Sequence, residues 1–366
     1  MTTRLQRLYD EQDQSPWLDN LKRGWITSGE LERWVERGVR GITSNPTIFQ
    51  KAMATGDAYD AQLSELTAAG ATTEDSYWAA VTKDITDALD IMAPVHEASA
   101  GLDGYVSLEL APELARQTQA STVAARHLHT TIDRPNLYVK IPGTAEGLPA
   151  IREMITEGRS INVTLIFSLE RYDAVIEAYL AGLENCPGDL KPVSSVASFF
   201  VSRLDTEIDR RLDAIGTEEA RALRGTAAVA QAQCAYQLFL ERFSGPRWDA
   251  LAARGARVQR PLWASTSTKN PDLPDTLYVD ELIGPNSVNT MPDATLEAFE
   301  DHGTLARRVD ADPDGARATL DRLTDVGVDI TDVTRVLEDE GVASFAKSFD
   351  ELLDVLGAKS EQLRQA

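Results

Sequence analysis

Cysteine and histidine are scarce in this sequence. Of 366 residues only two are cysteine, Cys186 and Cys234, and neither lies in a C-x-x-C motif. Four are histidine, and the one close pair, His127 and His129, has an i,i+2 spacing that points the two rings to different faces of a helix. We therefore expect neither a disulfide framework nor a metal site.

Long apolar runs and an excess of basic residues are also absent. No run approaches the ~20 apolar residues that a membrane-spanning helix needs, and residues 1–13 lack the apolar core of a signal peptide. Lys and Arg number 36 against 58 Asp and Glu, which gives a formal net charge of -22. Such a chain repels nucleic acid and anionic lipid. These features predict a cytoplasmic protein with no nucleic-acid or membrane partner.

What is present is an ordinary globular composition, with 43% hydrophobic and 26% charged residues. Short apolar runs alternate with longer helical patterns from one end of the chain to the other. A strand followed by a helix, repeated eight times, is the signature of a (β/α)8 barrel. The eight candidate strands are residues 16–21, 39–45, 104–110, 136–142, 160–168, 193–202, 259–266 and 282–290.

We therefore predict an α/β fold with one TIM-type (β/α)8 barrel domain over residues 1–366. Two helical segments exceed the minimal barrel: an insertion at about 211–255, after the sixth strand, and a C-terminal helix at about 340–362. Near the start, residues 27–30 have the Thr-x-x-Glu pattern of a capping box, for a helix that ends at Gly38. Other helices are expected at 79–92, 111–128, 147–154 and 171–183.

Several predicted strands carry polar residues in alternation with apolar ones, whereas strands of a parallel barrel usually read as almost uniformly apolar. In the fourth strand, for example, Leu137, Val139 and Ile141 share one face and Lys140 takes the other. The period of two places one set of polar side chains in a common interior. This set is Asp19, Asn45, Glu109, Lys140, Asn162, Thr164 and Ser198, with Thr43 and Phe200 on the same faces of their strands.

Lys140 indicates what kind of site this interior forms. Of eight lysines, it alone is embedded in an apolar strand, where desolvation favours the neutral, nucleophilic amine. A structural ion-pair network of Lys140 with Asp19 and Glu109 is the alternative. We favour an active site at the carboxyl ends of the strands, because the polar residues come from six strands. The residues thus predict a lyase or transferase that forms a Schiff base, with no cofactor or metal.

Five strand motifs resemble those of the transaldolase family, in the same order, and the resemblance extends over residues 17–292. The long connection after the sixth strand resembles the longer bacterial branch of that family. The motifs are GITSNPTIF at 41–49, VSLEL at 106–110, YVKIPGT at 138–144, NVTLIF at 162–167 and SFFVSR at 198–203.

This resemblance implies a mechanism without a metal, in which Lys140 attacks the ketone of a ketose phosphate such as sedoheptulose 7-phosphate or fructose 6-phosphate. Asp19 would be the acid/base for cleavage of the C3–C4 bond, and Glu109 with Thr164 would hold the catalytic water. Asn45 and Asn162, with Thr43 and Ser198 nearby, would bind the dihydroxyacetone part.

Phosphate recognition is implied for Arg203, whose guanidinium suits an anion. Many relatives have a second arginine after the seventh strand, whereas this chain reads Ser265-Thr-Ser-Thr-Lys269. We expect Lys269 or the hydroxyls to replace it. The expected partners are therefore sugar phosphates, and the expected assembly is a monomer or a homodimer.

Three other functions fit parts of the pattern. A fructose-6-phosphate aldolase of the same superfamily would release dihydroxyacetone instead of transferring it, and the side chains at Glu109 and Phe200 would separate the two. A deoxyribose-phosphate-type aldolase would need a second interior lysine, which the strands lack. A barrel that serves only as a binding module would be expected to lose Lys140 or Asp19.

Overall fold

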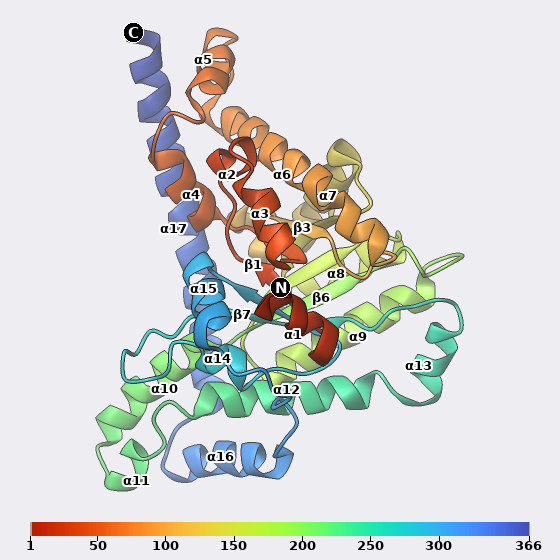
Figure 1. Cartoon of the computed structure of the whole chain (residues 1–366), viewed down its shortest axis with the longest axis vertical. Helices are drawn as coiled ribbons and strands as arrows, with labels where there is room; N and C mark the ends of the chain where they lie inside the picture. Colours follow the sequence, from red (N-terminus) through yellow and green to blue (C-terminus); the bar gives the residue numbers. More distant parts are fainter. Residues whose placement is uncertain (1, 366) are drawn as a thin grey trace.

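A computed structural model describes residues 2–365, which form a closed barrel of eight parallel strands, as predicted (Figure 1). The strands follow one another in chain order, and β8 closes on β1 with pairs from Gln14↔Ser287 to Leu18↔Met291. The strands are β1 (Gln14–Leu18), β2 (Gly41–Thr43), β3 (Tyr105–Glu109), β4 (Leu137–Pro142), β5 (Ile161–Ile166), β6 (Ser195–Phe200), β7 (Arg260–Ala264) and β8 (Ser287–Met291).

Helices surround this barrel (Figure 1). They are α1 (Arg4–Gln12), α2 (Arg23–Thr27), α3 (Glu30–Arg37), α4 (Pro46–Ala54), α5 (Asp60–Ala68), α6 (Thr73–Ala98), the 3-10 helix η1 (Pro112–Arg116), α7 (Thr118–Ile132), α8 (Gly147–Thr156), α9 (Leu169–Asn185), α10 (Ser202–Ile215), α11 (Glu218–Arg221), α12 (Ala227–Arg242), α13 (Gly245–Ala252), α14 (Leu277–Asp280), α15 (Asp293–His302), α16 (Pro313–Asp325) and α17 (Ile330–Gln365).

Every residue of the eight strands is buried, because helices cover the outer faces and side chains fill the interior. At the amino ends of the strands, Asp103 accepts from Arg40 at 2.7 Å and from Arg260 at 2.9 Å. Next to this cluster the rings of Tyr138 and Tyr105 stack at 4.0 Å, and Trp17 stacks on Tyr138 at 6.1 Å. These groups fill one end of the barrel and leave the carboxyl ends for a site.

Three helical details differ from the sequence-based expectation. The capping box at residues 27–30 is wrong: Thr27 belongs to α2, and its hydroxyl donates to the carbonyl oxygens of Arg23 and Gly24. Helix α3 instead starts after Gly29, whose φ is 74°, without a side-chain cap, and it does end at Gly38. The helix expected at 111–128 is divided into η1 and α7.

The two additional helical segments are present with different bounds. The segment predicted at 211–255 begins inside α10 and continues through α11, α12 and α13. The C-terminal helix, predicted at 340–362, is α17 and starts ten residues earlier, at Ile330. It runs along one side of the barrel and packs against α4, α5 and α6 (Figure 1).

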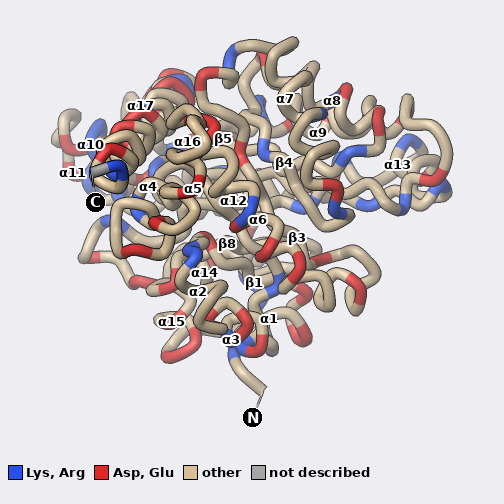
Figure 2. Tube along the Cα trace, turned by 90° about the horizontal axis from the view of Figure 1, so that it is seen from above, with Lys and Arg blue, Asp and Glu red and all other residues tan. Residues whose placement is uncertain are grey.

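Acidic residues are spread over the surrounding helices and loops, with basic residues between them (Figure 2). Many of these charges are paired in short helical spacings, as in Lys83 with Asp87 at 2.8 Å. None of the helices in residues 2–365 has the length and apolarity needed to cross a membrane.

Candidate active site

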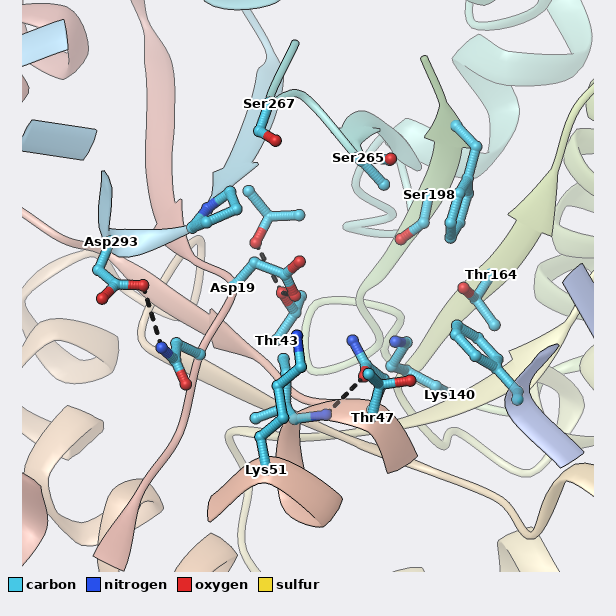
Figure 3. A pocket seen from close by; sticks show the side chains of 18 of the residues that line it. Asp19, Thr43, Thr47, Lys51, Lys140, Thr164, Ser198, Ser265, Ser267 and Asp293 are labelled. Carbon is cyan, nitrogen blue, oxygen red and sulfur yellow. Dashed lines mark hydrogen bonds between the residues drawn. The ribbon is translucent and has the colours of Figure 1, made fainter. Parts of the chain in front are cut away.

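A cavity of about 650 Å³ opens at the carboxyl ends of the strands (Figure 3). Ten of the twelve predicted site residues line it. These ten are Asp19, Thr43, Asn45, Lys140, Thr164, Ser198, Phe200, Arg203, Ser265 and Lys269, while Glu109 and Asn162 lie behind them.

Lys140 lies at the bottom of this cavity on β4 and is 4% exposed. Its Nζ donates to the carbonyl oxygen of Ser44 at 2.9 Å and to Oε2 of Glu109 at 3.0 Å. The parallel register of β3 and β4 places Glu109 directly beside Lys140. Burial raises the pKa of Glu109, although the charge of Lys140 opposes the shift. A proton on the amine therefore has a basic acceptor within hydrogen-bond distance.

Asp19 follows β1 and faces Lys140 across the cavity (Figure 3). Its carboxylate accepts a hydrogen bond from Oγ1 of Thr43 at 2.7 Å, and Thr43 also contacts Thr290 at 2.6 Å. Asp19 is partly exposed and lines the cavity, yet desolvation by the surrounding protein raises its pKa against the charge of Lys140. A carboxyl group with a raised pKa can both give and take a proton near neutral pH.

Thr164 supplies a hydroxyl with no partner among residues 2–365. Its Oγ1 is buried and lines the cavity. The next residue, Leu165, has a φ of 57°, and the pairing of β5 with β6 shifts register between Val163 and Ile166. This irregular backbone is rare for a leucine and accompanies a free hydroxyl at the cavity wall.

Asn162 and Ser198 form a hydrogen-bonded chain below the cavity. Ser198 donates to Oδ1 of Asn162 at 2.7 Å, and Asn162 donates to Oγ of Ser107 at 3.0 Å. Asn45 has a second task, because its Oδ1 caps α4 by accepting from the backbone N–H of Ile48 at 3.0 Å. The Asn45 side chain is thus fixed, with its amide nitrogen left for a ligand.

Four cationic side chains line the outer part of the cavity: Arg203, Lys269, Lys22 and Lys51. Arg203, in the first turn of α10, interacts with Glu109 and Asp19 only through space, and burial lowers its pKa. Lys269 donates to Oγ of Ser267 at 2.8 Å, and its pKa is lowered by desolvation and by Arg203. In a chain with a net charge of -22, cations gathered without bonded carboxylates form a binding site for an anion.

Sequence reasoning missed several residues of this cavity. Lys22 lies in the loop after β1 and Lys51 lies on α4, both outside the strand motifs, whereas Thr47, also on α4, lies inside the motif at 41–49 but was given no role. A signal existed for these three, since loops and helix starts that follow barrel strands carry binding residues. Phe345 of α17 also lines the cavity, and nothing in its helical spacing distinguishes it from other apolar residues of that helix.

A (β/α)8 barrel whose cavity contains a buried lysine bonded to Glu109, the carboxyl group of Asp19 and several cationic side chains has the features of a TIM-barrel enzyme with a lysine nucleophile. Enzymes with this fold carry their active sites at the carboxyl ends of the strands, and the cationic lining of this cavity suits a polar, anionic ligand.

Comparison with known proteins shows to which enzyme family the chain belongs. The family model described as transaldolase/fructose-6-phosphate aldolase matches residues 16–356. A transaldolase of Thermobifida fusca is 55% identical over 92% of this chain and 93% of its own length. One of Parafrankia sp. is 52% identical over 96% and 95%, and transaldolase 2 of Streptomyces coelicolor is 49% identical over 99% of both chains. The chain belongs to the transaldolase/fructose-6-phosphate aldolase family, and the recognition of an enzyme of this family is confirmed.

Proposed function

We propose that this chain is a transaldolase. It moves a dihydroxyacetone unit from sedoheptulose 7-phosphate to glyceraldehyde 3-phosphate and so yields erythrose 4-phosphate and fructose 6-phosphate. The observation that carries the proposal is Lys140, a buried lysine bonded to Glu109 at the bottom of a cavity whose outer part is cationic. Relatives that match nearly the whole chain are named transaldolase, and this supports transaldolase over the fructose-6-phosphate aldolase alternative.

Schiff-base formation starts at Lys140. Glu109 accepts the ammonium proton, and the free amine attacks the ketone carbon of the donor. The carbinolamine then loses water to give an iminium ion. The hydroxyl of Thr164 and the carboxyl of Glu109 hold that water, and the unpartnered Oγ1 of Thr164 supports this role. The same water returns at the end to hydrolyse the product from Lys140.

Carbon–carbon cleavage follows at Asp19. Its carboxylate takes the proton of the C4 hydroxyl, the C3–C4 bond breaks, and the electron pair moves into the iminium to form an enamine. An aldose phosphate leaves. The enamine carbon then attacks the aldehyde of the acceptor, and Asp19 returns the proton to the new hydroxyl. The pKa of Asp19, raised by desolvation, suits this two-way transfer.

Arg203 and Lys269, with Ser265 and Ser267, bind the phosphate of donor and acceptor. Ser265 has a φ of 56°, and its Oγ lies 2.8 Å from that of Ser202, beside Arg203. A fixed serine and two cations compensate for the absence of a second arginine. The substrate is thereby oriented with its ketone toward Lys140 and its phosphate toward solvent.

Borohydride trapping tests the covalent step. Fructose 6-phosphate with borohydride should inactivate the enzyme and leave a reduced three-carbon group on the peptide that contains Lys140. Lys140→Arg should neither react nor turn over, because a guanidinium stays protonated. Lys51 and Lys269 line the same cavity, so a label on either would contradict the assignment.

A coupled assay separates transfer from release. With fructose 6-phosphate and erythrose 4-phosphate, the enzyme should form sedoheptulose 7-phosphate. With fructose 6-phosphate alone it should release little free dihydroxyacetone. Equal rates of ketone release with and without acceptor would favour the aldolase instead.

A further inference from the structure

Helix α17 contributes one side chain to the cavity although it is far from the other site residues in sequence. Phe345 lines the cavity beside Phe200 and Arg203. It is 5% exposed, as is Phe349 one turn later on the same helix. Phe349 packs instead against Tyr77, with ring centroids 5.1 Å apart, and does not line the cavity. Two equally buried rings of one helix thus have different surroundings.

The guanidinium of Arg203 lies near two aromatic rings. Its central carbon is 5.2 Å from the centroid of Phe200 and 5.9 Å from that of Phe345. Both distances fall within the range of cation–π attraction. Within residues 2–365 no carboxylate is bonded to Arg203, and its acidic neighbours act only through space. The two rings are therefore the groups that hold the guanidinium where it is.

An arginine held by rings keeps its N–H donors free. Glu109 and Asp19 are close enough to affect its pKa, as is Glu340 of α17. A direct bond to one of these carboxylates would occupy the donors that a phosphate needs, because a carboxylate and a phosphate bind the same fork of N–H groups. Aromatic faces attract the charge without competing for those donors.

The position of Phe345 is itself fixed by contacts of α17 with α4 and α5. Oγ1 of Thr47 lies 2.8 Å from Oγ of Ser348, and Lys359 contacts Asp60 at 2.6 Å. Thr47 also lines the cavity. The first contact joins α17 to α4, which carries site residues, and the second joins it to α5. Because both contacts hold α17 in place, the Phe345 ring has little freedom to move away from Arg203.

We propose that Phe345 is a positioning residue that orients Arg203 and so sets the preference of the enzyme for phosphorylated substrates. This inference rests on the proposed function, since it takes Arg203 as the phosphate ligand. The two can fail separately: loss of Lys140 trapping in the parent enzyme would refute the reaction, whereas the comparisons below address Phe345 alone.

The test compares Phe345→Leu with Phe349→Leu, which remove the same ring at equal burial. Phe345→Leu should raise KM for fructose 6-phosphate about five- to ten-fold, which lies between the values for an exposed and a fully desolvated cation–π contact. Its KM for unphosphorylated dihydroxyacetone as donor should change much less. Phe349→Leu should leave both KM values near those of the parent. Equal KM increases in the two variants would overturn the proposal.

A double-mutant cycle shows whether the effect passes through Arg203. In an Arg203→Ala background, Phe345→Leu should have almost no further effect on KM for fructose 6-phosphate. Phe345→Tyr, which keeps the ring, should bind this substrate like the parent and covers the case in which the leucine variant fails to fold. Additive effects in the cycle, or the same loss for Phe345→Tyr as for Phe345→Leu, would mean that Phe345 only fills space.

Discussion

At the scale of single residues, the proposed mechanism divides its proton transfers between two carboxyl groups. Glu109 is bonded to Lys140 at 3.0 Å, whereas Asp19 is bonded to Thr43 at 2.7 Å on the other side of the cavity. Burial or desolvation raises the pKa of both. Their separate partners imply separate steps, since each carboxyl can reach only the proton beside it.

The division predicts different defects for Asp19→Asn and Glu109→Gln. Asp19→Asn should lower the transfer rate by a factor of about 10² to 10⁴, because the C4 hydroxyl loses its base, yet dihydroxyacetone should still be trapped on Lys140. Glu109→Gln should slow trapping itself, since the ammonium proton and the water lose their acceptor. Rates of borohydride inactivation with dihydroxyacetone measure the difference. Identical trapping rates in the two variants would show that the roles are shared.

At the scale of elements, helix α7 contains a buried titratable group outside the site. His129 is 6% exposed, and its Nε2 has no partner among residues 2–365. Burial lowers the pKa of His129 to about 4. In the unfolded chain the histidine has a pKa of about 6.5, so below that pH the unfolded state takes up a proton that the folded state does not. The free energy of unfolding therefore decreases as the pH falls from about 6.5 toward 4.

His129→Gln should therefore reduce the acid sensitivity of the fold. Between pH 6.5 and 4 the parent should lose about 2–3 kcal/mol of unfolding free energy relative to the variant, measured by urea denaturation at each pH. His127→Gln is the matched control, because His127 is exposed on the same helix. A pH profile of His129→Gln that parallels those of the parent and the control would contradict the burial argument.

The strands and helices also show which parts of the fold could be predicted from the sequence. The eight strands were predictable because short apolar runs between helical patterns are a local property of the chain. Alternation within several of them, as around Lys140, then indicated which side chains face the interior. The start of α3 was not predictable. The sequence has a capping pattern at Thr27, but the Thr27 hydroxyl donates to a carbonyl oxygen within α2 and does not cap α3. Phe345 could not be separated from Phe349, since both repeat at helical spacing and only tertiary packing assigns one of them to the cavity.

At the scale of the whole molecule, the barrel has one end for stability and one for binding. Asp103 is fully buried at the amino ends of the strands, between Arg40 and Arg260. Although burial opposes it, the two arginines lower the pKa of Asp103 below its usual value. The aromatic stack of Trp17 and Tyr138 lies between this cluster and the cavity residues. Gly41 is required beside the stack, because a Cβ there would collide with the Trp17 ring.

Asp103→Asn should destabilise the fold without changing the site. Removing one partner of a buried ion pair leaves Arg260 uncompensated and should cost about 3–5 kcal/mol of unfolding free energy. KM and kcat of the folded enzyme should stay close to those of the parent. Asp87→Asn, in the exposed pair with Lys83, should cost less than about 1 kcal/mol. Denaturant titrations that gave the same small loss for both variants would argue against the cluster as a stabilising element.

The late place of α17 in the chain affects the order in which a working enzyme is made. A ribosome delivers all eight strands by Met291, and the barrel can then close through the pairing of β8 with β1. Phe345 and the contact of Ser348 with Thr47 follow only with the synthesis of α17. A nascent chain can thus hold Lys140 and Asp19 in place while one wall of the cavity is still missing. If Phe345 orients Arg203 as proposed, full substrate affinity is acquired last, after the barrel itself is complete.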